Sequence, residues 1–185
     1  CEAQARTAGP MHVQPLRSRI SDNWFYLIVD GDAGALVDPI DAEVGVEAVR
    51  RLGLRDVVIV TTHGHPDHAG GNAAAAATLG CDVLGPGYEE PFGVRYDRAL
   101  REPQTLTVGA SQWSVRHAPG HTPGHIVLMH EAADGGVDLV SGDVLFVAGC
   151  GNCRFGGDAA QQGETYARRV ANLPASTRFY PGHDS

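Results

Sequence analysis

The sequence contains no lysine, so its 14 basic residues are all arginines, and these are spread along the chain rather than clustered. The formal net charge of -8 at pH 7 gives no basic surface of the kind that binding to nucleic acid requires. The chain also has no apolar run that approaches the roughly 20 residues needed to cross a bilayer. We therefore expect neither a nucleic-acid partner nor a membrane span.

Cysteine is scarce as well, since the chain has only four: Cys1, Cys81, Cys150 and Cys153. They are too few and too scattered for a disulfide scaffold, which favours a reduced, cytoplasmic setting. Cys150 and Cys153 have the CxxC spacing of a redox pair or of half a zinc knuckle. No second CxxC completes a four-ligand zinc site, so we interpret both as structural loop cysteines.

The length of 185 residues, with 43% hydrophobic and 19% charged residues, is that of one globular domain with a large core. Residues 1–10 lack periodicity, a basic start and an apolar stretch, so no intact signal peptide is expected there. We interpret residues 1–10 as a flexible extension or a remnant of cloning before a start at Met11. A lipid-modified Cys1 is the alternative. Residues 11–185 then form the single domain.

Apolar, β-branched runs bounded by glycine and proline predict a strand-rich fold. Asp41 follows Pro39 and is expected to cap the first helix. Residues 85–103 are expected to be loop or broken helix, and residues 144–157 irregular. Strands in two groups with helices between them indicate a mixed α/β layered domain. The expected strands are 24–29, 35–38, 56–61, 81–84, 104–108, 112–117, 126–130, 137–141 and 177–180, and the expected helices are 41–51, 70–79 and 159–172.

Three histidines and a carboxylate occupy six consecutive positions, His63-Gly64-His65-Pro66-Asp67-His68. An apolar run precedes this cluster and an alanine-rich run follows it, which places the cluster on a loop between a buried strand and a helix. Such a loop can direct several side chains to one point while the strand and the helix hold it in place. The pattern predicts half of a metal site.

Three later strands end in residues of the same chemical type. His121 lies in a second histidine-containing loop, Asp143 follows the next strand but one, and His183 follows the last strand. Histidine and carboxylate are ligands that a borderline metal such as zinc accepts. A single histidine such as His125 is more often a core or surface residue, but the joint pattern predicts a metal centre.

These residues resemble the metallo-β-lactamase superfamily, whose HxHxDH signature occupies residues 63–68. Within that superfamily the resemblance is closest to glyoxalase II, the hydroxyacylglutathione hydrolase, and it extends from about Met11 to the end of the chain. The first motif is specific for the superfamily, and the others narrow it to one branch. Those others are Ser21-Asp22-Asn23, His68-Ala69-Gly70-Gly71-Asn72, Gly120-His121-Thr122-Pro123-Gly124-His125 and Gly142-Asp143-Val144-Leu145-Phe146-Val147-Ala148-Gly149-Cys150-Gly151.

The resemblance implies an α/β fold, a four-layer αββα sandwich, with two divalent metal ions at one edge. Zinc is the expected metal and iron the alternative. A hydroxide between the two ions would be the nucleophile, because their charge lowers the pKa of bound water. Asp67 would also be catalytic by orienting that hydroxide. The implied function is thioester hydrolysis. By position, His63, His65 and His121 would hold the first ion, Asp67, His68 and His183 the second, and Asp143 would bridge them.

On the substrate side the chain departs from glyoxalase II. That family has a basic residue and aromatic residues after Gly-Cys-Gly, where this chain has Asn152, Arg154 and Phe155, our candidate substrate-binding residues. It has a tyrosine where this chain has Ser185, and a C-terminal helical domain without a counterpart in these residues. The expected partner is a small-molecule or carrier-linked thioester, with the acyl group and the thiol left open. The oligomeric state has no signature.

Two other hypotheses compete with hydrolysis. The segment 155–184 also resembles persulfide dioxygenases of the same superfamily, in which one iron held by two histidines and one aspartate activates oxygen. The corresponding residues here are His63, His121 and Asp143. The second competitor is a non-catalytic metal-binding module that serves in interactions, although seven ligands exceed what a structural site needs.

Overall fold

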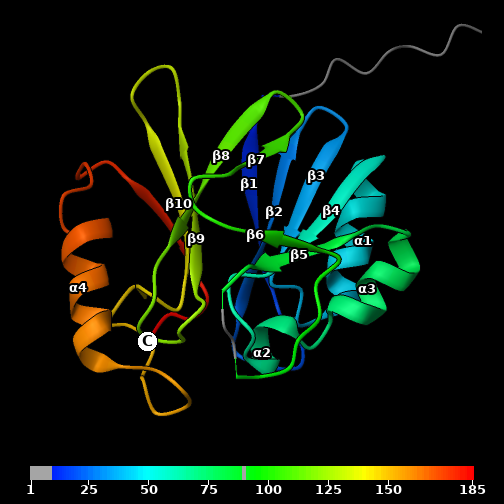
Figure 1. The fold of residues 1–185 in the computed structure, drawn as a ribbon. Coiled ribbons are helices and arrows are strands. Elements are labelled where there is room, and N and C mark those ends of the chain that lie inside the picture. Colours follow the sequence, from blue (N-terminus) through cyan, green and yellow to red (C-terminus); the bar gives the residue numbers. More distant parts are fainter. Residues whose placement is uncertain (1–9, 89–90) are drawn as a thin grey trace, which may run out of the picture.

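The protein is described by a computed structural model that covers residues 10–88 and 91–185. Eleven strands form two sheets within these residues, and the sheets pack face to face (Figure 1). Residues 1–9 of the expected extension, Cys1 included, lie outside the described residues, so the nature of that extension stays a prediction.

The first sheet has six strands whose spatial order follows the sequence. The first two pairs are antiparallel, so that the expected hairpin at residues 24–38 is confirmed, and the remaining pairs are parallel. Because neighbouring parallel strands end at the same edge, the loops after β3 and β4 open side by side. The strands are β1 (His12–Arg17), β2 (Trp24–Asp30), β3 (Ala33–Val37), β4 (Asp56–Val60), β5 (Val83–Pro86) and β6 (Arg98–Leu100).

The second sheet has five strands in the order β11-β10-β9-β8-β7. Its pairs are antiparallel except for β10 and β11, which run parallel. The loop before β9 and the segments after β10 and β11 therefore reach the end of the molecule where α2 lies (Figure 1). The strands are β7 (Thr105–Val108), β8 (Ser111–His117), β9 (Ile126–Glu131), β10 (Val137–Gly142) and β11 (Arg178–Pro181).

Helices cover the outer faces of both sheets. The helices α1 (Ala42–Leu52) and α3 (Asn72–Leu79) lie against the first sheet, and α4 (Ala159–Arg169) lies against the second (Figure 1). Asp41 caps α1 as predicted, because its side chain accepts a hydrogen bond from the backbone N–H of Val44. The expected four-layer αββα sandwich is confirmed.

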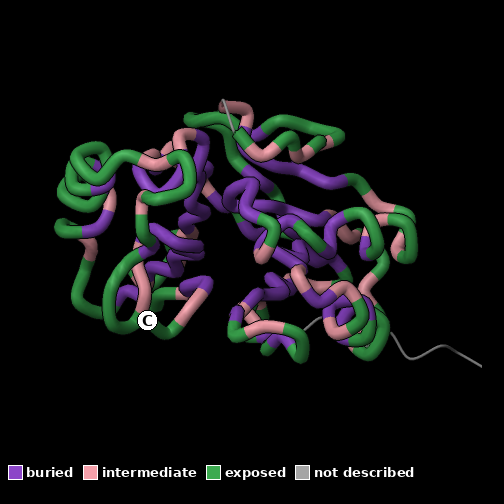
Figure 2. Tube along the Cα trace, turned by 90° about the horizontal axis from the view of Figure 1, so that it is seen from below, coloured by how far each residue is buried: buried purple, intermediate pink, exposed green. Residues whose placement is uncertain are grey.

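The strand β2 explains why the middle layers are apolar at nearly every position. Successive side chains of a strand point to opposite faces. Phe25 and Leu27 pack in the cluster that includes α1, whereas Tyr26 and Ile28 pack in the cluster between the sheets, together with Trp113. A strand between two layers therefore needs apolar residues on both faces, and the buried segments gather in the middle of the molecule (Figure 2).

Three local expectations need correction. β1 was not predicted, because its residues are only partly buried and it is defined by pairing with β2 along its whole length. Residues 85–103 are not all loop, since β5 extends to Pro86 and β6 pairs with it. The helix α4 ends at Arg169 rather than at residue 172, because Val170 and Leu173 turn to pack under the second sheet. No helix among the described residues is long and apolar enough to span a membrane.

Candidate metal centre

All seven predicted ligands meet at one end of the two sheets. The loop after β4 and the one-turn helix α2 (Pro66–Ala69) supply four of them, and the loop before β9, the end of β10 and the segment after β11 supply one each. The potential ligands form three overlapping groups, and within each group the ligand atoms lie within 4.8 Å of one another. The groups are His63, His65 and His121; His63, His68 and Asp143; and Asp67, His68 and His183. The first and third groups are the two sets assigned from the resemblance.

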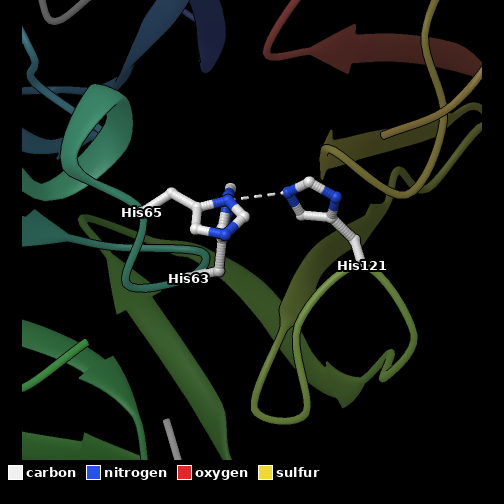
Figure 3. Close-up of side chains that lie close together, drawn as sticks. All are labelled: His63, His65 and His121. Atoms are coloured by element: carbon white, nitrogen blue, oxygen red, sulfur yellow. Dashed lines mark hydrogen bonds between the residues drawn. The ribbon is translucent and has the colours of Figure 1, made fainter. Parts of the chain in front are cut away.

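The imidazole rings of His63, His65 and His121 face a common point from two sides (Figure 3). His63 and His65 come from the first sheet, and His121 comes from the second. The Nδ1 atom of His65 lies 3.1 Å from Nε2 of His63 and 2.9 Å from Nε2 of His121. In a tetrahedral zinc site with Zn–N bonds of about 2.0 Å, neighbouring nitrogens are about 3.3 Å apart. These two distances are therefore close to the spacing of neighbouring zinc ligands, and all three nitrogens lie within 4.8 Å of one another.

The outward nitrogen of each ring forms a hydrogen bond that determines which of the two ring nitrogens carries the proton. Nδ1 of His121 is 2.7 Å from the carbonyl oxygen of Asn152, and Nε2 of His65 is 3.3 Å from that of Phe155, and a carbonyl can only accept. Nδ1 of His63 is 3.0 Å from the Thr62 hydroxyl, which donates its own proton elsewhere. The three inward nitrogens thus present lone pairs to one another, an arrangement that a cation between them would stabilise.

The second group combines a half-exposed carboxylate with two histidines. The Oδ2 atom of Asp67 lies 3.3 Å from Nε2 of His183 and 3.7 Å from Nε2 of His68. Asn23 holds this group together, because its side-chain Nδ2 donates to Oδ2 of Asp67 and lies 3.2 Å from Nε2 of His183.

Asp143 lies between the two groups. One carboxylate oxygen is 3.2 Å from Nε2 of His68, and the other is 3.3 Å from Nε2 of His121 and 3.8 Å from Nε2 of His183. Nε2 of His68 and Oδ1 of Asp143 are buried, and neither forms a hydrogen bond of normal geometry within residues 10–88 and 91–185. Two buried polar atoms that face each other without a hydrogen bond of normal geometry are costly, and a proton or a metal cation between them removes that cost. The donor set therefore fits two metal ions with Asp143 between them.

The electrostatics of the buried site agree with this donor set. Burial lowers the pKa of His63 well below its ordinary value and also lowers that of His121, so both rings are neutral. Burial would raise the pKa of Asp143, but His68, His121 and His183 lower it to about 2. Burial would lower the pKa of His68, but the carboxylates of Asp143 and Asp38 hold it well above its ordinary value. His63 and His121 are therefore already in the neutral state that binds metal, whereas a metal ion at His68 would displace the proton that the two carboxylates favour there.

Asp38 supports the site although the sequence did not point to it. Its side chain is 6% exposed and accepts hydrogen bonds from the backbone N–H and the hydroxyl of Thr62. Nδ1 of His68 lies 3.0 Å from its Oδ2. The carboxylate thereby leaves Nε2 of His68 facing Asp143. A signal was present, because Asp38 follows a strand, as Asp143 and His183 do. Asn23 was quoted only as part of a motif.

Two glycines allow the chain to pass close to the ligands. A Cβ atom on Gly182 would lie 2.4 Å from Oδ1 of Asp143, and one on Gly151 would lie 2.4 Å from Nδ1 of His121. Both distances are shorter than a carbon can occupy, so glycine is required by space at these positions. His125 is not among the grouped ligands, and its Nε2 accepts a hydrogen bond from the backbone N–H of Asp143.

A cavity of about 780 Å³ opens over the ligands. Of the candidate substrate-binding residues, Asn152 and Phe155 line this cavity, whereas Arg154 is exposed and is not part of its wall. Cys150 also lines the cavity, and Cys150 and Cys153 are both free thiols. The assignment of substrate contacts stays a prediction.

Comparison with known proteins identifies relatives. The family model described as the metallo-beta-lactamase superfamily matches residues 21–183. Hydroxyacylglutathione hydrolase of Anaeromyxobacter dehalogenans is 42% identical over 163 residues, which cover 88% of this chain and 62% of that protein. The chain thus spans about three fifths of the length of this curated relative.

Solved structures match the fold over nearly the whole chain. ETHE1 from Myxococcus xanthus is 27% identical with a TM-score of 0.77, and the match covers 95% of this chain and 76% of that one. A protein determined in a di-iron-bound form is also 27% identical, with a TM-score of 0.75 and coverage of 92% and 91%. The predicted fold and the HxHxDH resemblance are confirmed, and the matched segment includes all seven predicted ligands. The chain belongs to the metallo-beta-lactamase superfamily.

Proposed function

We propose that the chain hydrolyses a thioester at a two-metal centre, with His63, His65 and His121 on one ion, Asp67, His68 and His183 on the other, and Asp143 between them. The observation that carries this proposal is the convergence of three lone pairs in the first group, next to the buried Nε2 of His68 and Oδ1 of Asp143, which form no hydrogen bond of normal geometry among the described residues. The name of the hydroxyacylglutathione hydrolase relative supports the choice of a thioester.

Two bound divalent cations would supply a water of lowered pKa and would polarise the carbonyl of the substrate. The donor set suits zinc, and iron is the alternative because one relative was determined in a di-iron-bound form. The acyl group and the thiol enter from the cavity, which has room for more than a small acyl group.

Asp67 is the residue that we assign to proton handling. It lines the cavity, and its side chain is about half exposed. Burial would raise its pKa, but the hydrogen bonds from His183 and Asn23, with the charge of His68, lower it below its ordinary value. Asp67 is therefore anionic at neutral pH and can accept a hydrogen bond from an attacking water, which orients that water.

A second candidate is the mononuclear iron persulfide dioxygenase, with His63, His121 and Asp143 as ligands. Asp143 lies 3.3 Å from His121, and His63 shares one group of potential ligands with His121 and another with Asp143. The fold match to ETHE1 is the comparison that supports this candidate. It leaves Asp67, His68 and His183 without a role, and for that reason we favour the hydrolase.

The test is a panel of thioesters of glutathione, coenzyme A and a carrier protein, offered to metal-loaded protein while thiol release is measured. We expect hydrolysis of at least one class. His63→Ala should abolish activity under either candidate function, and His68→Ala should lower it by at least about 100-fold only for a dinuclear hydrolase. His130→Ala is the matched control, because His130 lies on β9 away from the site. Oxygen uptake without thiol release would contradict the proposal.

A further inference from the structure

Three phenylalanine rings surround the metal cavity, and none of them belongs to the ligand set. The rings of Phe92 and Phe155 lie edge-on to the ring of His65, with centroids 4.5 and 6.5 Å away. The ring of Phe146 lies 5.3 Å from that of His183, on the side of the other ligand group. All three residues line the cavity. Aromatic surface is therefore present on both sides of the place where a substrate carbonyl would bind.

Phe92 and Phe155 come from two segments that meet at the cavity. Gly156 follows Phe155, and a Cβ atom on it would lie 3.0 Å from Cγ of Pro91 and 3.7 Å from the ring of Phe92. Phe155 is nevertheless 65% exposed, so most of its ring is open to solvent. An exposed ring beside a second aromatic ring in a cavity indicates a contact surface for an apolar group.

The charge of the cavity wall points to the same kind of ligand. Among the described residues that line the cavity there is no arginine, and the carboxylates of Asp67 and Asp143 belong to the ligand set. A neighbouring cavity of about 470 Å³ shares residues 150–152 with the first, and its described lining contains no charged side chain. Carboxylates and phosphates are usually held by arginine, lysine or backbone N–H groups. Among the described residues, the wall thus offers neither arginine nor lysine to a charged substituent next to the scissile bond.

We propose that this cavity selects thioesters with an uncharged apolar group, aromatic or branched aliphatic, next to the scissile carbonyl, and that Phe92 and Phe155 form the slot for this group. The inference rests on the proposed function, because it names the substrate class of the same site. The apolar group is attached either to the carbonyl carbon, as part of the acyl group, or to the sulfur, as part of the thiol. In both cases it offers the two phenylalanine rings the same uncharged apolar surface.

The experiment measures kcat/KM for metal-loaded protein in two series. In the first, the thiol is glutathione and the acyl group is acetyl, lactoyl or phenylacetyl. In the second, the acyl group is acetyl and the thiol is glutathione, N-acetylcysteamine or benzyl mercaptan. We expect one series to favour its aromatic member by about 10-fold or more, since differences of one or a few carbons in an apolar pocket change kcat/KM by about 10–200-fold.

Phe155→Ala should lower the ratio of kcat/KM between the aromatic and the acetyl member by about 10-fold, chiefly through KM. Phe179→Ala is the matched control, because Phe179 is 38% exposed on β11 and does not line the cavity. The control should leave this ratio unchanged. Since the Phe155 ring is largely exposed, the melting temperature of Phe155→Ala should match that of the wild type.

Each outcome decides between the two proposals. Thioester cleavage without preference for an apolar member, or with the same ratio in Phe155→Ala and Phe179→Ala, would overturn the slot while hydrolysis stands. If no thioester is cleaved, the proposed function fails, and calorimetric binding of S-benzylglutathione, an uncleavable thioether, tests the slot alone. Weaker binding by Phe155→Ala than by Phe179→Ala supports the slot, and equal binding overturns it.

Discussion

Replacing Asp38 by asparagine keeps the shape of a buried side chain and removes its charge. Asp38 accepts two hydrogen bonds from Thr62, at 2.7 and 2.6 Å, and lies 3.0 Å from Nδ1 of His68. Its backbone has a positive φ of 53°. Asparagine and aspartate adopt this conformation more readily than other residues with a side chain, so the substitution tests the charge rather than the backbone.

The size of the effect follows from the donors that Asp38 serves. An amide has one acceptor oxygen, so at least one donor from Thr62 or His68 loses its acceptor. A hydrogen bond to a charged group contributes about 1.5–3 kcal/mol. Loss of such a partner behind a metal ligand lowers metal affinity by about 10–100-fold. We expect Asp38→Asn to weaken the ion held by His68 by this factor. The ion held by His63 should be affected less, because Asp38 is linked to His63 through the Thr62 hydroxyl and not by a direct hydrogen bond.

The assay is competition between metal-free protein and a chromophoric chelator, which resolves the binding of two ions. Asp32→Asn is the control, since Asp32 is an exposed carboxylate that pairs with Arg55 in a turn. A thermal melt of the metal-free variants checks that both are folded. If Asp38→Asn binds both ions as tightly as the wild type and Asp32→Asn do, Asp38 does not position His68 for metal.

Two further predictions test space and charge. Gly182→Ala places a carbon 2.4 Å from a carboxylate oxygen of the site, so activity should fall by at least about 10-fold. The carbon added by Gly163→Ala in α4 meets no atom within 4 Å, so this variant should be about 0.5–1 kcal/mol more stable than the wild type in a denaturant titration. A larger loss of activity or stability in Gly163→Ala than in Gly182→Ala would refute the steric argument. Burial would raise the pKa of Asp138, but hydrogen bonds from Arg178 and Tyr180 lower it below its ordinary value. The pair therefore contributes stability above about pH 4, the unfolded pKa, and loses it as pH falls through the lower folded pKa. Arg178→Met should lower the melting temperature at pH 7, and the gap to wild type should narrow below pH 4; a gap independent of pH would contradict the assignment.

The sequence pointed to the candidate ligands because they follow apolar strands and nearly every one lies next to glycine or proline. His63, His121 and Asp143 are distant in the chain, but strand ends of a layered sheet meet at one edge. Asp38 also follows a strand, yet a single aspartate before a proline is common in turns. Only its contacts with Thr62 and His68 identify its role.

The fold elements that were missed depend on pairing rather than on local pattern. β1 contains Pro15 and alternates weakly between buried and exposed residues, and its partner β2 determines it as an edge strand. β6 has three residues, two of them exposed, and is defined by its parallel register with β5. No periodicity exists in segments this short. The strongly apolar β2 and β4 and the capped α1 were predicted because their own residues determine them.

The most direct test of the two-metal account is a titration of metal-free protein with zinc, with thioester hydrolysis and bound metal measured in the same samples. We predict that activity rises until two ions are bound per chain and that Asp143→Asn reduces both the second equivalent and the activity. Activity that reaches its maximum with one ion per chain, or protein that requires a single iron and consumes oxygen, would contradict the account.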